Sequence, residues 1–363
     1  MGKSKFYVFN FWGFSAVAIV ITSYYYIANL TLYGIPKFAE PYASFLGFDT
    51  ELTSDNDVTS VKYEPKGPIV LHENDYLLLN TERCKFVRHK RAKKVVLFVI
   101  VTMSRNYYTR QQLRLSWALP DIEDDVRFES VYVMGVGRSA LRDDNMRVWH
   151  NEFGELSREM VDYRDMLLVD YIEDYTNISV KLVAGLHYAK HHCHDVDYIM
   201  VVHDDVMIRR DWLIPYLWEL PSHNFIGGDC ADSRKPDRNP NSKFYVGKQE
   251  FEHEVYPSFC YGSAVIMTPD IRDKLLAQTA ITPYFKRDDV YLGMLMRDAN
   301  ISPVTMPNVR HEVKDMRYCA VKNLLMLQPV PMARQKMLRE EHERFEDEGR
   351  KCTPEKGSQG GEL

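Results

Sequence analysis

The stretch that decides the fold is Tyr198-Ile-Met-Val-Val-His-Asp-Asp-Val-Met-Ile208. Its apolar and β-branched residues predict a fully buried strand. The run stops at His203-Asp204-Asp205 and resumes at Val206, so the acidic residues fall where open α/β sheets bind their ligands. Two carboxylates and an imidazole at that place are a candidate site for Mg²⁺ or Mn²⁺. The alternative is a strand followed by a solvated acidic turn, because Asp is common in turns.

Length and composition indicate a globular protein. The chain has 363 residues, of which 45% are hydrophobic and 27% are charged. Its net charge of -5 argues against non-specific nucleic-acid binding, which needs a basic surface, so we expect no nucleic-acid partner. Aromatic residues make up 12% of the chain, which suits sugar ligands, although core packing explains them equally well.

The first residues predict a membrane anchor. Lys3 and Lys5 precede an uncharged stretch, 6–32, that is long enough to cross a bilayer, which takes about 20 residues. Positive charge before the stretch places the amino terminus in the cytosol and the bulk of the chain in the lumen. A cleaved signal peptide is the alternative, but no convincing cleavage site follows Tyr24-Tyr25-Tyr26.

The remaining chain divides by composition. We predict a cytoplasmic tail (1–5), a transmembrane signal anchor (6–32), a proline-interrupted stem (33–90), a lumenal domain (91–330), and a charged helix with a disordered tail (331–363).

The cysteines and two sequons bear on the compartment. No pair of the six cysteines has CxxC spacing, so a zinc site is not expected. In a lumenal chain they can form disulfides, but six cysteines allow about 15 connectivities and the sequence does not choose among them. Asn177-Ile-Ser179 and Asn300-Ile-Ser302 are candidate N-glycosylation sites.

A first strand and a basic helix precede the central strand. The apolar run Val95–Val101 predicts the first strand of the domain. In the predicted helix Thr109–Trp117, Arg110 and Arg114 share one face and could hold a diphosphate in bidentate fashion. The alternative is an amphipathic surface helix.

Two further helices carry candidate site residues. Lys181 lies near the start of a helix predicted over 177–193, where a lysine opposes the helix dipole and suggests an anionic partner, although solvated lysines are commoner. Asp288 and Asp289 open another helix, where acidic residues are favoured by the dipole. Alternatively, a carboxylate there that faces a pocket could act as a general base. The polar segment 231–242 predicts a loop over the site.

Several segments together resemble the β-1,3-galactosyltransferase family, glycosyltransferase family 31. The resemblance runs from about Val95 to His311 and rests on five motifs in order. They are Arg110-Gln-Gln-Leu-Arg-Leu-Ser-Trp117 (RxxIRxTW), the stretch from Tyr163 to Lys181 (YxDIIxxDFxDxYxNLTLK), Val202-His-Asp-Asp-Val206 (the DxD position), Tyr256-Pro-Ser-Phe-Cys-Tyr-Gly262 (YPxYxxG) and Asp288-Asp-Val-Tyr-Leu-Gly293 (EDVxxG).

The resemblance implies an α/β fold of the GT-A nucleotide-sugar-binding type with a mixed central sheet. It also implies a UDP-sugar donor, a glycan acceptor, Mn²⁺ or another divalent cation, and residence in the Golgi membrane as a single-pass type II protein. The activity would be inverting transfer of galactose or N-acetylglucosamine to a sugar hydroxyl in β-1,3 linkage. By motif position, Asp289 is the general base, Asp205 and His203 are metal ligands, and Arg110, Arg114, Asp165, Lys181 and Asp204 lie on the donor side.

Beyond the substituted Leu113 and Ser116 of the first motif, the sequence departs from the family pattern at two positions that bear on the chemistry. His203 replaces the first aspartate of DxD, and Asp288 replaces glutamate. Imidazole can bind Mn²⁺, so the metal site could survive the first change. His311 is the nearest candidate for the family's late metal-ligating histidine. These departures leave open a second hypothesis, a catalytically inactive glycan-binding protein or chaperone on the same fold.

Overall fold

The computed structural model describes residues 67–85, 92–137, 146–349 and 352. The predicted cytoplasmic tail and anchor lie outside these residues, as do most of the predicted stem and the tail from 353. None of the described helices is both long enough and apolar enough to cross a membrane.

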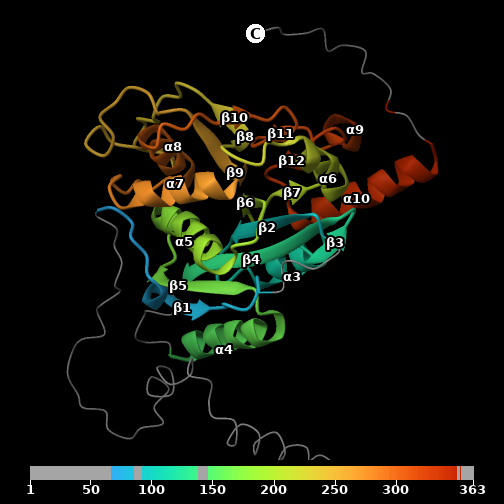
Figure 1. Ribbon diagram of the computed structural model, residues 1–363, viewed down its shortest axis with the longest axis horizontal. Coiled ribbons are helices and arrows are strands. Elements are labelled where there is room, and N and C mark those ends of the chain that lie inside the picture. Colours follow the sequence, from blue (N-terminus) through green and yellow to red (C-terminus); the bar gives the residue numbers. More distant parts are fainter. Residues whose placement is uncertain (1–66, 86–91, 138–145, 350–351, 353–363) are drawn as a thin grey trace, which may run out of the picture. The chain divides into compact units, whose positions relative to one another are not determined.

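Within the described residues the fold is mixed α/β, built on a nine-stranded sheet (Figure 1). The strand order is β1-β5-β4-β2-β6-β9-β8-β10, with β3 added to β4. Strands β5, β4, β2 and β6 are parallel to one another, whereas β1 and β9 run antiparallel to β5 and β6. The bounds are β1 Tyr76–Leu79, β2 Lys94–Val101, β3 Asp121–Glu123, β4 Val126–Val136, β5 Met166–Ile172, β6 Tyr198–His203, β8 Ile226–Ala231, β9 Phe259–Met267 and β10 Val304–Thr305.

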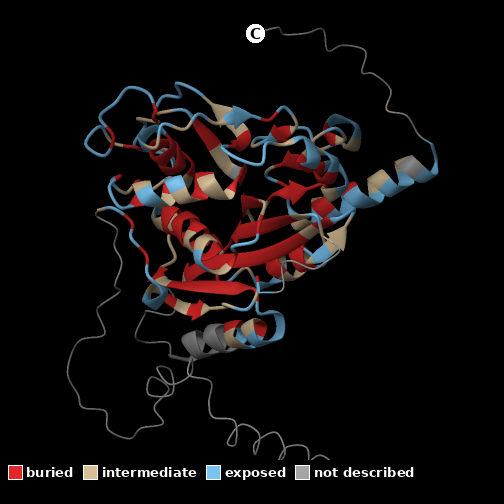
Figure 2. Ribbon diagram, in the orientation of Figure 1, coloured by how far each residue is buried: buried red, intermediate tan, exposed pale blue. Residues whose placement is uncertain are grey.

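The central strands are buried on both faces, as their unbroken apolar sequences predicted (Figure 2). Side chains alternate along β2: Leu97 and Val99 pack in the core layer of α5 and α8, while Phe98 packs in the layer that includes α3 and α6. The helices bury their apolar residues in these two layers. Their bounds are α3 Tyr107–Arg114, α4 Met146–Tyr163, α5 Ile178–His192, α6 Arg210–Glu219, α7 Pro269–Thr279 and α8 Asp288–Asp298.

A second, three-stranded sheet has the order β11-β12-β7. It continues directly from the central strand, because β7 begins three residues after Asp204. Helix α10 covers this sheet: Gln335 is buried and its Nε2 donates to the carbonyl oxygens of Val206 (3.3 Å) and Val330 (3.0 Å). The bounds are β7 Met207–Ile208, β11 Val309–Arg310, β12 Met326–Leu327, α9 Tyr318–Val321 and α10 Met332–Asp347.

All six cysteines are paired, as Cys84–Cys193, Cys230–Cys260 and Cys319–Cys352. The first pair joins the end of α5 to a segment that we predicted to be stem. In the same segment β1 pairs with β5, so residues 67–85 are part of the folded unit, a correction to the stem boundary at residue 90. The signal was weak because β1 has only four residues and follows a proline-interrupted stretch.

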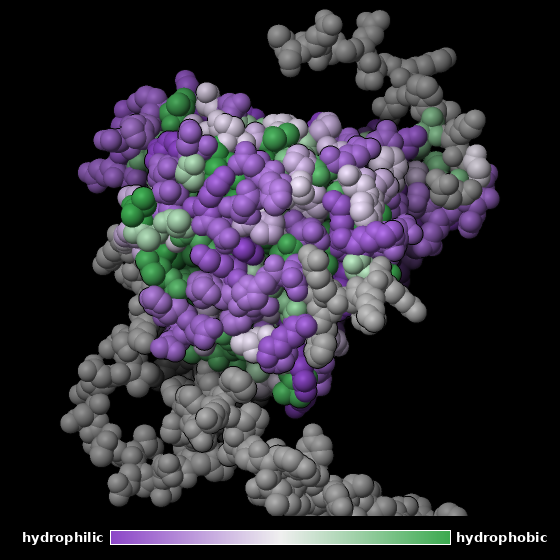
Figure 3. Space-filling model, viewed as in Figure 1, coloured by the Kyte–Doolittle hydropathy of each residue, from purple (hydrophilic) through white to green (hydrophobic). Residues whose placement is uncertain are grey.

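The sequence predicted whether a segment forms a helix or a strand more accurately than it predicted the first and last residues of that element. The strands at Val95–Val101 and Tyr198–His203 and the helix after Pro331 are confirmed. The helix predicted over Thr109–Trp117 instead begins at Tyr107 and ends at Arg114, with Asn106 as its N-cap residue. Figure 3 shows one face of the molecule, which is mostly hydrophilic with scattered hydrophobic residues.

Candidate functional site

The candidate site lies at the carboxyl end of β6, where β9 begins and α8 starts. His203 ends β6, and its Nε2 lies 2.8 Å from Oδ2 of Asp288, the first residue of α8. A Cβ atom on Gly262 in β9 would come within 3.0 Å of the same oxygen, so the glycine makes room for this pair. His203 and Asp288, both departures from the family motifs, therefore contact each other.

Electrostatics indicates that His203 and Asp288 form an ion pair. Burial by itself would lower the pKa of His203, but the Asp288 carboxylate, with smaller contributions from Asp205 and Asp204, raises it to about 9. Burial would likewise raise the pKa of Asp288, but the His203 imidazolium holds it below its usual value. A protonated imidazole has no lone pair for a metal.

His203, Asp204 and Asp205, at the carboxyl end of β6, bind three separate sets of partners. Oδ2 of Asp204 accepts from Thr102 Oγ1 (2.6 Å) and Asn106 Nδ2 (2.8 Å), whereas Oδ1 of Asp205 accepts from Gln328 Nε2 (2.6 Å). Among the described residues, no group of three or more His, Cys, Asp or Glu is arranged to hold a metal ion. As they are arranged here, His203 and Asp205 do not fit the predicted role of shared ligands.

A second histidine–aspartate pair joins Asp229 of β8 to His311, the residue that follows β11. His311 Nδ1 is 2.6 Å from Oδ2 of Asp229, and the His311 backbone N–H donates to the same oxygen at 2.9 Å. Burial would raise the pKa of Asp229, but these bonds from His311 lower it. The His311 ring stacks on Tyr261, with centroids 3.3 Å apart. His311, the candidate for the family's late metal-ligating histidine, thus binds the carboxylate of Asp229. The sequence analysis did not identify Asp229 as a candidate site residue.

Asp289, the predicted base, pairs with Arg287. Its Oδ2 is 2.9 Å from Arg287 Nη2, and its Oδ1 accepts from the backbone N–H of Val290 at 2.8 Å. Burial raises the pKa of Asp289, Arg287 opposes that effect, and the Asp288 carboxylate adds to it. The side chain keeps 9% of its surface exposed. A buried carboxylate with a raised pKa and a small opening to solvent is suited to general-base chemistry.

Three of the predicted donor-side residues form a closed ionic network with Glu159 of α4. Arg110 binds both Glu159 oxygens (2.8 and 2.7 Å), and Arg114 binds Glu159 (2.6 Å) and both oxygens of Asp165 (2.8 and 2.7 Å). The four side chains are between 0% and 6% exposed, and two cations neutralise two anions. Each is engaged with its neighbours, so direct contact with a donor stays a prediction.

The same network fixes the loop that follows β2. Arg110 donates to the carbonyl oxygens of Met103 (2.6 Å) and Ser104 (3.0 Å). Lys181, the fourth predicted donor-side residue, pairs with Glu173 and donates to the carbonyl oxygen of Thr102 (2.8 Å). Together with the bonds to Asp204, these contacts hold the loop 102–106 at the carboxyl edge of the sheet, next to His203.

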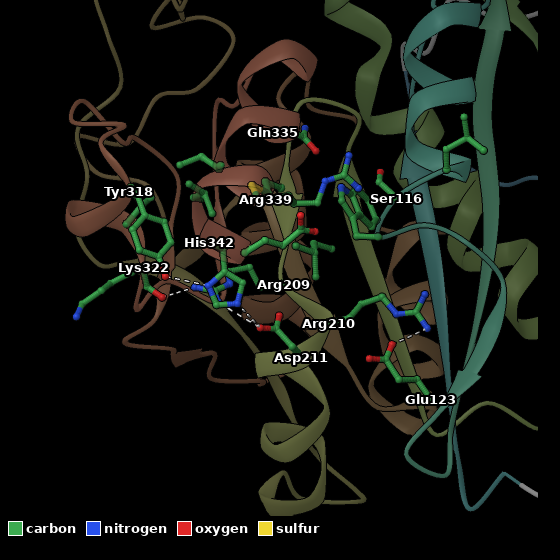
Figure 4. A pocket seen from close by; sticks show the side chains of 18 residues that line it. Ser116, Glu123, Arg209, Arg210, Asp211, Tyr318, Lys322, Gln335, Arg339 and His342 are labelled. Atoms are coloured by element: carbon green, nitrogen blue, oxygen red, sulfur yellow. Dashed lines mark hydrogen bonds and ion pairs between the residues drawn. The ribbon is translucent and has the colours of Figure 1, made fainter. Parts of the chain in front are cut away.

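A cavity of about 390 Å³ lies between the start of α6, α9 and α10 (Figure 4). None of the residues predicted for the site lines it. Two ion pairs line it: Arg209 binds Asp211 at 3.1 Å, and Arg210 binds Glu123 at 3.1 Å. The pocket that a general base at the start of α8 would face is a different one, and it stays a prediction.

The two sequons differ in their surroundings. Asn177 is the N-cap residue of α5, and its Nδ2 donates to the Ile172 carbonyl oxygen (3.2 Å). Ser179 is fully buried, with its hydroxyl bound to the Phe285 carbonyl oxygen (2.6 Å). Asn300 and Ser302 are both exposed after the end of α8. Glycosylation of either asparagine stays a prediction.

Sequence reasoning missed Arg287, Glu159, Glu173 and Asp229. Arg287 and Glu173 carried local signals, because Arg287 stands immediately before the two aspartates of one motif and Glu173 lies within the motif from Tyr163 to Lys181. Glu159 lies outside every motif, and Asp229 meets His311 across 82 positions of the chain. No spacing rule in one sequence predicts such a contact.

Comparison with known proteins agrees with the sequence motifs. A sequence model of the galactosyltransferase family matches residues 108–307, more than half of the chain. "Beta-1,3-galactosyltransferase 2" of Mus musculus is 22% identical over 289 residues, which cover 75% of the chain and 65% of that relative. "UDP-GlcNAc:betaGal beta-1,3-N-acetylglucosaminyltransferase 8" of Mus musculus is 28% identical over 243 residues, which cover 65% and 59%. The chain thus spans less than two thirds of the length of these relatives.

Among solved structures, the galactosyltransferase LgtC in complex with donor and acceptor sugar analogs aligns over 68% of the chain and 95% of its own length, with a TM-score of 0.32 and 12% identity. The match of the family sequence model carries the assignment, because it includes all five motifs and most of the site: the chain belongs to the galactosyltransferase family.

Proposed function

We propose that the chain is an inverting hexosyltransferase that moves galactose or N-acetylglucosamine from a UDP-sugar to a glycan hydroxyl in β-1,3 linkage. The observation that carries the proposal is Asp289: a buried carboxylate with a raised pKa and a small opening, at the start of α8 in a galactosyltransferase-family chain. The names of the relatives, which are β-1,3-galactosyl- and β-1,3-N-acetylglucosaminyltransferases, support the choice of sugars and linkage.

In this proposal Asp289 takes the proton of the acceptor hydroxyl. The acceptor oxygen attacks the anomeric carbon, the bond from that carbon to the diphosphate oxygen breaks, and UDP departs with the electron pair. One displacement with one base inverts the configuration and needs no covalent intermediate. The loop 102–106 and Asp204 would border the nucleotide, because ligands of open α/β sheets bind at the carboxyl ends of strands.

Mn²⁺ stays a prediction from the resemblance, and no step above depends on it. We also infer a GT-A-type domain that resides in the Golgi lumen behind a type II signal anchor. Three disulfides support an oxidising compartment.

The test is UDP release by the full-length protein from a panel of UDP-sugars, with and without Mn²⁺, together with NMR of the product's anomeric centre. We expect acceptor-dependent release from UDP-galactose or UDP-N-acetylglucosamine and a β-linked product. An α-linked product would contradict the inverting mechanism.

The second candidate is a glycan-binding protein or chaperone without turnover. It is favoured by the ion pair that occupies His203 and by the separate partners of Asp204 and Asp205. It predicts no UDP release from any donor and no UDP binding by calorimetry, with or without Mn²⁺.

A further inference from the structure

Three segments that are distant in sequence meet around Arg287 and Asp289. The Tyr284 hydroxyl donates to the Thr176 carbonyl oxygen, which ties the 3-10 helix η3 (Tyr175–Asn177) to the segment before α8. Lys286 donates to the Tyr245 carbonyl oxygen (2.7 Å) and pairs with Glu250 (2.9 Å), which ties the long β8–β9 loop to the same segment. Figure 1 shows that loop beside α8.

Two of these segments, η3 and the β8–β9 loop, each present an exposed aromatic ring close to the base. Tyr175 is 49% exposed and Phe244 is 37% exposed. The Arg287 guanidinium lies 5.2 Å from the Phe244 ring centroid. Burial raises the pKa of Tyr175, Arg287 opposes this, and Asp289 and Asp288 add to it, as expected for a phenol close to all three charges.

Packing of the core does not require these two rings. The aromatic cluster of this region consists of Phe251, Tyr256 and Phe285, which are buried and lie 5.0 to 6.1 Å from one another between ring centroids. Tyr175 and Phe244 stand outside that cluster, and both leave a large part of their surface in water. Aromatic rings beside a few convergent polar groups are typical of ligand contacts.

The chemistry beside the rings suits a sugar hydroxyl. An ionised carboxylate offers about four acceptor positions. Arg287 and the Val290 N–H occupy three of those on Asp289, at 2.9, 3.3 and 2.8 Å. One position remains for a hydroxyl that approaches through the 9% of the side chain that is exposed. A pyranose ring has an apolar C–H face and a polar edge, so it can stack on an aromatic ring while its hydroxyl reaches the carboxylate.

We propose that Tyr175 and Phe244 form an aromatic platform that binds the terminal pyranoside of the acceptor glycan and presents its hydroxyl to Asp289. The inference rests on the proposed function of this site and names its acceptor contacts. The bound sugar is a neutral pyranoside with an unobstructed apolar face, such as a β-galactoside. Arg287 contacts both the Phe244 ring and the Asp289 carboxylate, so we assign it the role of orienting the carboxylate and not of binding the transferred sugar.

The experiment measures acceptor and donor KM for full-length Tyr175→Ala and Phe244→Ala, with methyl β-galactoside as the acceptor. We expect a rise of about fivefold to tenfold in acceptor KM for each variant, because an aromatic contact contributes on the order of a kcal/mol, and an unchanged donor KM. Tyr175→Phe keeps the ring and should keep the acceptor KM. The matched control is Trp218→Ala, which removes a 44% exposed ring near Lys94, at the opposite end of β2.

A second readout does not require turnover. Saturation-transfer NMR with methyl β-galactoside should give a signal for the wild-type protein and for Trp218→Ala, and should lose it for the two alanine variants. If the protein releases UDP from no donor but the saturation-transfer signals are as expected, the transferase proposal is wrong and the aromatic platform is supported. If wild-type turnover occurs and both alanine variants keep the acceptor KM, the platform is wrong. If the wild-type protein neither turns over nor binds the glycoside, both are overturned.

Discussion

Two clusters of charge in this molecule look alike in sequence and differ in three dimensions. The closed network of Arg110, Arg114, Glu159 and Asp165 has almost no exposed surface, and every charge meets an opposite charge. The open cluster of His203, Asp288, Arg287 and Asp289 keeps between 9% and 20% of each side chain exposed. The comparison shows that charged motif residues stabilise the fold when each charge is buried and paired with an opposite charge. Charged residues that stay partly exposed to solvent can still take part in catalysis.

The largest expected effect is on stability, from opening the closed network. Glu159→Ala leaves Arg110 and Arg114 buried without their shared partner, which should lower the free energy of unfolding by about 3–5 kcal/mol. Chemical denaturation measures this. Glu155→Ala, an exposed position on the same helix, is the control and should change stability by no more than about 0.5 kcal/mol. Equal effects of the two variants would show that the network is not a stabilising centre.

The next effect concerns how the open cluster is positioned. The His203–Asp288 bond is charge-assisted, and such bonds contribute roughly 1.5–3 kcal/mol. We expect His203→Gln and Asp288→Asn each to lower turnover by about tenfold, through a shift of α8 and Asp289. The double variant should be little worse than either single variant, because the two changes remove the same interaction. Fully additive losses would mean that the residues act independently.

The smallest effect is a pH dependence of stability that distinguishes the two clusters. The folded pKa of His203 is raised to about 9 from an ordinary value near 6.5, so its stabilising contribution is complete below pH 6.5 and is lost as the pH rises through 9. Burial would lower the pKa of Arg114, but Asp165 holds it above its ordinary value, so the closed network keeps its cation over the same range.

Thermal unfolding between pH 6 and 10, in the presence of a chelator, measures this contribution. The wild-type protein should lose stability on the alkaline side, and His203→Gln should lose less. An identical pH profile for the two proteins would contradict the ion pair.

The sequence predicted three members of the open cluster, His203, Asp288 and Asp289, but neither Arg287 nor the contacts between these residues. The apolar run before His203 placed it at the end of a buried strand, and the motif placed Asp289 at a helix start. Their contacts join positions up to 85 residues apart, which depend on how β6, β9 and α8 assemble. For the closed network, the i,i+4 spacing correctly put Arg110 and Arg114 on one face. That face is buried because Glu159 of α4 pairs with both arginines. Nothing in the local sequence of α3 predicts this contact.

The sequence also did not predict the amino-terminal boundary of the folded unit, because that boundary depends on contacts between distant segments. Residues 67–85 have the composition of a linker, yet β1 hydrogen-bonds to β5 and Cys84 is bound to Cys193. A short edge strand has too few residues to show a clear hydrophobic periodicity in its sequence. Its pairing depends instead on contacts with the neighbouring strand of the sheet, here β5.

The most direct test replaces one carboxylate by its amide in each cluster, Asp289→Asn and Glu159→Gln, and measures turnover per folded molecule and the unfolding midpoint of each full-length variant. We predict that Asp289→Asn loses about 10²- to 10⁴-fold in turnover while its midpoint stays at the wild-type value. We predict the reverse for Glu159→Gln, a lowered midpoint with turnover close to wild type. Unchanged turnover in Asp289→Asn would contradict the assignment of the base and, with it, the distinction between the two clusters.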